Sequence, residues 1–254
     1  MTSTIVSPRL PPELEYTIFL LAFGNDPLEA KCLALIAKRV FDWLIPHIFR
    51  VVKLSVIAPL PIKFNEETYK KHGHHVRHLM LETVVLAGYL HLFPNVVNLA
   101  YWVTYNPRDL PFILQLPLTC ISMRPTLDLF QVFAKVTHLD LWATIDPRSS
   151  EIRSALYFPK LTHLCVTTIL EEAALRLFCE RERCPELEVL VIWAYQDSEV
   201  MLNDEPPTVD DQRVVMIQCH AGRDWEQGAR GGLDMWGFAE QVLEARKVLG
   251  GDGE

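Results

Sequence analysis

Apolar residues recur along most of the chain at one fixed spacing, in which an apolar position is followed by others three and five residues later. This triplet occurs eight times, beginning at Val51, Val76, Val96, Leu118, Val136, Leu161, Leu187 and Val214. Successive triplets begin 18 to 27 residues apart. A regular period of this length predicts stacked repeats, each of which adds one short strand to a parallel sheet.

The segments between the triplets favour helices along one side of that sheet. Residues 126–135 and 170–179 carry apolar residues at helical spacing, and a shorter segment at 155–157 precedes another strand. Proline stands at the entry of four predicted strands, in Phe93-Pro94, Leu116-Pro117, Phe158-Pro159 and Cys184-Pro185. The predicted fold class is α/β, with an irregular solenoid of parallel strands over residues 51–220. The alternative is an α/β domain whose periodicity is coincidental.

The chain before the first triplet predicts a small bundle of three short helices over residues 9–50. Pro12 suits the first turn of a helix over residues 12–23, which ends at Gly24-Asn25. A second helix begins at Asp26-Pro27, and residues 41–49 form a third. Because so small a bundle buries little surface, we expect it to pack against the first repeat.

The chain after residue 196 is predicted to close the solenoid. Residues 197–212 form an acidic loop that contains proline, and residues 223–232 form a turn-rich bridge. A final helix is expected at residues 233–249. Residues 221–254 are therefore expected to act as a C-terminal cap on the open end of the repeats.

Composition and charge exclude several classes of function. The net charge of −8 argues against a nucleic-acid binder, which usually carries a basic face. No apolar run reaches the length of a membrane span, and the first residues lack the order of a signal peptide. The six cysteines form no CxxC pair, which favours reduced core thiols. We therefore expect a cytoplasmic or nuclear protein that binds neither membrane nor nucleic acid.

Alternation along the predicted strands places two rows of unusual side chains on the concave face of the sheet. One row holds tryptophans at positions 102, 142 and 193, and another holds histidines at positions 78, 138 and 163. Asp140 lies between His138 and Trp142 on the same face. Aromatic residues dominate binding hot spots, so this face predicts a groove for a partner. The alternative is that each tryptophan packs under a neighbouring loop.

The sequence contains no recognisable catalytic or metal-binding motif. There is no G-x-S-x-G or H-E-x-x-H, and the glycines at 228–232 lack the lysine of a phosphate loop. The histidines at 72, 74, 75 and 78 lack cysteine or carboxylate partners, so we expect a solvated turn and no metal or cofactor. A hydrolase would need a serine or cysteine within hydrogen-bond reach of His138 or His163.

Two resemblances follow from these motifs. Leu-Pro-x-Glu-Leu from Leu10, the segment Leu35–Phe41 and the segment His47–Val51 together resemble an F-box over about residues 9–52. Ala37 and Phe41 stand where that family usually has serine and tryptophan. The triplets resemble leucine-rich repeats without the usual asparagine after the strand. The combination resembles the F-box/leucine-rich-repeat proteins, with irregular repeats like those of fungal members.

This resemblance implies a non-catalytic substrate-recognition subunit of an SCF-type, cullin–RING ubiquitin ligase. A Skp-type adaptor, and through it a cullin, would bind at Leu10, Pro11, Leu14, Ile18, Phe19 and Leu35. An unknown protein target would bind the concave face at His78, Trp102, His138, Asp140, Trp142, His163 and Trp193. The alternative is an interaction scaffold outside any ubiquitin ligase, whose N-terminal helices merely cap the repeats. In that case Leu14, Ile18 and Phe19 would be buried against the repeats.

Overall fold

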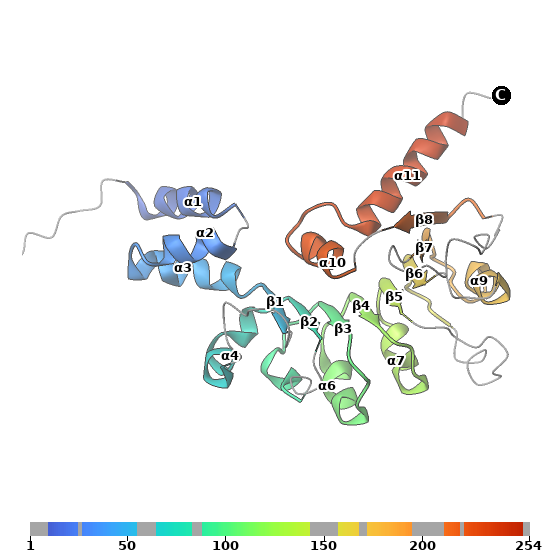
Figure 1. Ribbon diagram of the computed structural model, residues 1–254, viewed down its shortest axis with the longest axis horizontal. Helices are drawn as coiled ribbons and strands as arrows, with labels where there is room; N and C mark the ends of the chain where they lie inside the picture. The colour runs from blue at the N-terminus through green and yellow to red at the C-terminus, as the bar shows by residue number, and fades with distance from the viewer. Residues whose placement is uncertain are drawn as a thin grey trace, which may run out of the picture.

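The computed structural model shows an α/β protein built on one open, eight-stranded parallel sheet (Figure 1). It describes residues 10–24, 27–54, 65–82, 88–142, 157–167, 172–194, 211–218 and 221–250. The strands lie side by side in the order of the sequence, which suits a solenoid-like arrangement. They are β1 Val51–Leu54, β2 His78–Leu81, β3 Asn98–Tyr101, β4 Cys120–Met123, β5 His138–Leu141, β6 His163–Thr167, β7 Val189–Ala194 and β8 Val214–Gln218.

Short helices line the convex side of the curved sheet (Figure 1). They are α4 Glu66–His72, α6 Leu110–Gln115, α7 Phe130–Phe133 and α9 Glu172–Cys179, with 3₁₀ turns η1 Gly73–His75, η2 Leu90–Leu92, η3 Pro107–Asp109 and η4 Leu127–Leu129. The helices predicted at 170–179 and 126–135 are confirmed by α9 and by η4 with α7. Residues 155 and 156 lie outside the described residues, as does most of the predicted acidic loop.

The core lies between the sheet and these helices. The second triplet positions of β2 to β7 are Cα partners across the sheet, and all of them are fully buried: Leu79, Leu99, Ile121, Leu139, Leu164 and Leu190. Residues before the entry prolines complete this core, with Phe93, Phe158 and Cys184 fully buried. The predicted register is therefore confirmed for the six central strands.

The predicted register is wrong for the first and last strands. In β1 the partner of Leu79 is Val52, so the strand is displaced by two residues and keeps its face. In β8 the partner of Leu190 is Val214 and not Ile217. A shift of three residues reverses the side chains, because successive residues point to opposite faces. Ile217 therefore faces the concave side.

Three helices precede the sheet: α1 Pro12–Phe23, α2 Pro27–Ala34 and α3 Lys38–Ile48. The helix predicted at 12–23 is confirmed by α1. Their shared core consists of Phe23, Ala30, Val40 and Leu44. The end of α3 leads into β1, and Phe49 stacks on His72 of α4 at a ring-centroid distance of 5.0 Å. The trio is thus anchored to the first repeat through α3, as its small core requires.

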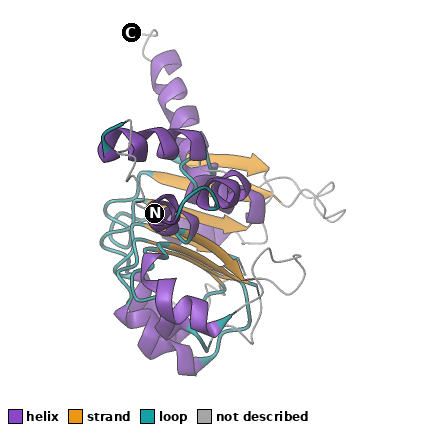
Figure 2. Ribbon diagram, turned by 90° about the vertical axis from the view of Figure 1, so that its left-hand side faces the viewer, coloured by secondary structure: helices purple, strands orange, loops and turns teal. Residues whose placement is uncertain are grey.

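Two C-terminal helices, α10 Ala221–Ala229 and α11 Met235–Gly250, lie on the concave side of the sheet (Figures 1 and 2). The final helix is confirmed, but the bridge predicted at 223–232 is wrong over most of its length, because α10 is helical. Gly228 of α10 allows the Asp234 side chain to pack closely against the helix, because a Cβ at that position would lie 2.3 Å from the Asp234 carboxylate. Among the glycines of the predicted bridge, Gly231, with φ of 84°, has the turn conformation that glycine favours.

The cysteines with described side chains carry free thiols. Cys165 and Cys184 are buried, and burial raises the pKa of the Cys184 thiol to about 12. Cys32 is exposed, so the prediction of a core thiol is wrong at that position. Cys219 lies outside the described residues.

The reversed face of β8 can be tested by alanine substitution at two neighbouring positions. Ile217→Ala is expected to lower the free energy of unfolding by roughly 2–5 kcal/mol, because Ile217 is only 7% exposed beneath α11. Met216 is 45% exposed on the opposite face, so Met216→Ala is expected to cost less than about 1 kcal/mol. Urea unfolding followed by circular dichroism measures both, and equal costs would contradict this assignment of faces.

Candidate functional site

The sheet brings the predicted concave residues together in three rows. The first row pairs His138 with His163, the second contains Ser122 and Asp140 as Cα partners, and the third holds the tryptophans. His78 belongs to the first row but lies on β2, three strands from β5. The strands therefore separate His78 from the other six predicted residues, which form one cluster over β3 to β7.

A hydrogen-bond network centred on Ser122 joins the second and third rows. The Ser122 hydroxyl accepts hydrogen bonds from the indole nitrogens of Trp102 at 2.7 Å and Trp142 at 2.6 Å. It donates its own proton to Asp140 Oδ2 at 2.6 Å. This arrangement uses the donor and both lone pairs of one hydroxyl, so Ser122 fixes both indole rings and the carboxyl group.

The tryptophans pack against one another above this network. The ring centroids of Trp102 and Trp142 are 4.1 Å apart, and Trp193 meets Trp142 edge-to-face at 6.1 Å. Trp102 and Trp142 remain partly exposed, whereas Trp193 is 1% exposed. Two of the three rings therefore still present surface to solvent.

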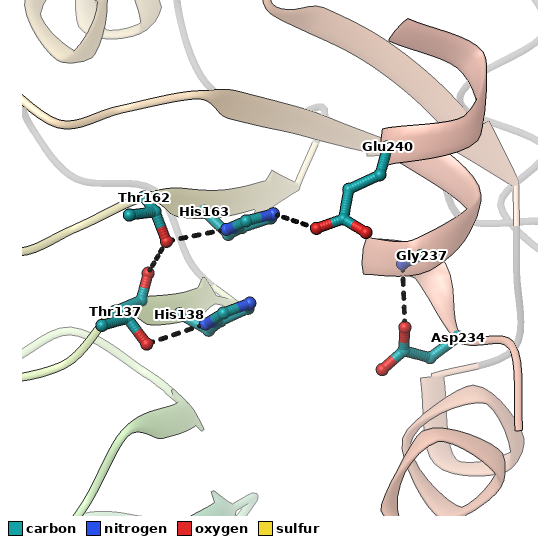
Figure 3. Close-up of polar contacts among 7 residues, drawn as sticks. All are labelled: Thr137, His138, Thr162, His163, Asp234, Gly237 and Glu240. Carbon is teal, nitrogen blue, oxygen red and sulfur yellow. Dashed lines mark hydrogen bonds and ion pairs between the residues drawn. The ribbon is translucent and has the colours of Figure 1, made fainter. Parts of the chain in front are cut away.

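The two histidines stack in parallel, with ring centroids 4.2 Å apart (Figure 3). In each ring Nδ1 contacts the hydroxyl of the preceding threonine, Thr137 at 2.9 Å or Thr162 at 2.8 Å. His163 Nε2 contacts Glu240 of α11 at 3.1 Å, and Trp236 of the same helix covers both rings edge-on. Burial, and then the neighbouring His163, lowers the pKa of His138 to about 4.

A small cavity of about 30 Å³ lies between this cluster and the C-terminal helices. Three carboxyl groups line it, those of Asp140, Asp224 and Asp234, and its volume is enough for a water molecule. Burial raises the pKa of Asp140 to about 6, although hydrogen bonds from Ser122, Cys165 and Trp142 oppose the shift. Burial and the nearby Asp234 also raise the pKa of Asp224 to about 6.

The C-terminal helices cover much of the concave face. Trp225 of α10 donates a hydrogen bond to Asn98 of β3 at 3.0 Å, and Met235 and Trp236 of α11 pack on Val191 and Ile217. Asp224 and Asp234 accept hydrogen bonds from the first amides of α11, at Met235 and Gly237. Helices, and not loops, therefore cover Asp140, His163 and Trp193.

Neither of the covering tryptophans nor Ser122 was among the predicted site residues. Ser122 could have been found, because the confirmed register pairs it with Asp140. Trp225 and Trp236 contact strands far away in the chain, and Trp225 lies 127 residues from Asn98. No local pattern indicates which strand such a residue meets.

The six predicted adaptor residues lie on the N-terminal helices or beside them, away from the sheet (Figure 1). Leu10 is 43% exposed, Leu14 52%, Ile18 51% and Leu35 87%, and Pro11 is also exposed. Phe19 is half-buried against the core of the three helices. Leu14 and Ile18 thus present apolar surface to solvent, and none of the six is part of the repeat core.

Within the described ranges, no group of three or more histidine, cysteine or acidic side chains could hold a metal ion. Among the same residues, no helix combines the length and apolar character needed to cross a membrane. Among the described residues, the side chains that hydrogen-bond to His138 and His163 are threonines and a glutamate, not the serine or cysteine that a hydrolase would need.

Comparison with protein-family models, with curated proteins and with solved structures found no match for this chain. The function must therefore be inferred from its own residues.

The buried carboxyl group of Asp140 predicts a particular pH dependence of stability. Its pKa is about 6 in the folded chain and about 3.9 when unfolded. The folded state therefore binds more protons between these values, and stability falls as pH rises from about 4 to about 6. Asp140→Asn removes this contribution, which amounts to at most about 1.4 kcal/mol per pH unit.

Urea unfolding at a series of pH values measures this effect. The stability of the unmodified chain relative to Asp140→Asn is expected to fall across that window and to become constant above about pH 7. Asp42 is exposed on α3, so Asp42→Asn provides a control with the same change in charge. The free energy of unfolding of this control is expected to vary with pH as it does in the unmodified chain. An unchanged slope in Asp140→Asn would contradict the raised pKa.

Proposed function

We propose that this protein is a non-catalytic substrate-recognition subunit of an SCF-type ubiquitin ligase. The N-terminal helices α1 to α3 would bind a Skp-type adaptor, and the repeat sheet would bind a target protein. The chain would bring a target lysine close to the charged ubiquitin-conjugating enzyme, so its contribution is proximity.

The observation that carries the proposal is the apolar surface left exposed on the N-terminal helices. Leu14 and Ile18 are four residues apart on one face of α1, and each is about half exposed. Leu21, at 77% exposure, continues this face by one turn. Leu35, at 87%, is exposed beside α3 and not on α1. A small helical module with its own core and an uncovered apolar face has the properties expected of a docking element.

The alternative of a scaffold capped by its N-terminal helices is less well supported. A cap would bury Leu14 and Ile18 against the first repeat, whereas they face solvent. The contact with the repeats is made by the end of α3, through Ile45, Ile48 and Phe49. This attachment leaves α1 available.

The proposed target surface is the part of the concave side that α10 and α11 leave accessible. Trp102 and Trp142 contribute aromatic surface there, and His138 is also partly exposed. Ser122 holds both indole rings in position, so little side-chain freedom would be lost on binding.

Adaptor binding can be tested with the double variant Leu14→Asp plus Ile18→Asp. We expect co-purification of a Skp-type adaptor with the full chain, and at least a tenfold loss in the variant, because two charges replace the apolar contact. Phe19 is left unchanged because it packs inside the three-helix core.

Val248→Asp plus Leu249→Asp is the matched control. Both residues are exposed apolar positions on α11, so the control adds the same charge at the other end of the molecule. Circular dichroism verifies that both variants fold. Equal adaptor recovery from the test and control variants would overturn the proposal.

A further inference from the structure

A second surface of the molecule is cationic and lies where the first strands begin. A pocket of about 560 Å³ is lined by Arg50, Arg77 and four histidines, His47, His74, His75 and His78, together with Pro46 and Val97. No aspartate or glutamate is among these lining residues. In a chain of net charge −8, such a pocket is a local reversal of sign.

The fold places the two arginines side by side. The carbonyl oxygen of Arg50 accepts the amides of Arg77 and His78, and the carbonyl oxygen of Arg77 accepts those of Val97 and Asn98. Arg50 and Arg77 therefore occupy the same position in successive repeats, immediately before the strand. Later repeats place Thr119, Thr137 and Thr162 at this position, and each hydroxyl donates to the preceding carbonyl of the series.

Two like charges at neighbouring positions of a ladder repel each other. Within the described residues, no carboxylate forms an ion pair with Arg50 or Arg77, and the Arg77 guanidinium donates a 3.3 Å hydrogen bond to the carbonyl of Asn95. Both side chains are exposed. An anion would relieve this repulsion.

The charged forms of the pocket histidines are disfavoured, first by burial and then by the neighbouring positive groups. Burial, and then Arg50 and Arg77, lowers the pKa of His78 to about 4, and burial with Arg50 lowers the pKa of His47. Burial, and then His74 and His72, lowers the pKa of His75. His78 Nδ1 is also buried without a hydrogen-bond partner. These rings could donate to a bound anion once protonated.

We propose that this pocket, formed by Arg50 and Arg77 with the histidines around them, binds a phosphate monoester carried by a side chain of the target protein. Two guanidinium groups suit one phosphate, since each can offer paired N–H donors to its oxygens. The charge of such a phosphate, about −1.5 to −2 at neutral pH, matches two arginines. The acidic remainder of the chain disfavours a longer polyanion.

The pocket borders the concave side of the sheet, where the proposed target surface lies. His78 belongs to the first concave row and also lines the pocket, and three strands separate it from His138. The volume holds a phosphate group together with part of the chain that carries it. Recognition of a phosphorylated target rests on the proposed function, whereas binding of phosphate to the pocket does not.

The first experiment follows the histidine resonances of the full chain by NMR during titration with inorganic phosphate, with chloride at equal ionic strength as reference. We expect saturable shifts at His47 and His78 and a rise in the pKa of both, because the bound anion favours their charged forms. Arg50→Gln plus Arg77→Gln is expected to weaken phosphate binding at least tenfold, and the double lysine variant to retain part of it.

Arg108→Gln plus Arg181→Gln removes the same charge from exposed positions elsewhere and is expected to behave as the unmodified chain. Removing the adjacent like charges is expected to leave the urea midpoint unchanged or slightly raised, so loss of binding would not reflect unfolding. Shifts that do not saturate, or that persist in the double glutamine variant, would overturn the phosphate site.

The second experiment passes the chain over a degenerate peptide library with a fixed central phosphoserine, beside the same library with serine. At least tenfold stronger retention on phosphoserine, lost in Arg50→Gln plus Arg77→Gln, supports recognition of a phosphorylated target. Equal retention on both libraries overturns it, even where inorganic phosphate binds. Neither experiment contains the adaptor, so loss of adaptor binding would overturn the ligase proposal and leave the phosphate site standing.

Discussion

The pairing of each short strand with its neighbours is the constraint on which the rest of this structure depends. Seven of the eight strands contain only four or five residues, too few to be stable alone. Leu139 is fully buried only because Ile121 and Leu164 lie beside it on adjacent strands. The stability of one repeat therefore depends on the next, and the core is continuous from β1 to β8.

The same pairing of strands also creates the concave face, where buried polar groups need hydrogen-bond partners. On the concave side it aligns Ser122 with Asp140 and His138 with His163, which are polar groups that must find partners once they are buried. Ser122 satisfies one carboxyl oxygen and two indole nitrogens, while Asp140 Oδ1 remains without a partner. Burial is the main cause of the raised pKa of Asp140. The C-terminal helices cover this part of the sheet and leave a cavity of about 30 Å³ beside Asp140.

The sequence predicts the strands that follow the periodic triplets. It does not predict positions whose residue type is set by contacts between distant parts of the chain. The triplets give the strands and the register from β2 to β7, because each reflects a fully buried pair of positions. In β8, Ile217 is apolar because of α11 and not because of the repeat core, so the triplet has the right composition on the wrong face. The glycines of α10 indicate turns locally, but Gly228 is required by the adjacent Asp234 side chain. Neither cause is visible within a short window of sequence.

The two proposed binding surfaces lie at the same end of the molecule, and α3 joins them. Its preceding loop carries the exposed Leu35, while His47 in its last turn and Arg50 just after it line the cationic pocket. α3 continues into β1 and is fixed to the first repeat by Phe49, so the two surfaces are held in a rigid relation. A phosphorylated target at Arg50 and Arg77 would therefore lie close to an adaptor on α1. Since proximity is the only contribution that such a subunit makes, a short and rigid connection between the two surfaces suits that role better than a distant or flexible one.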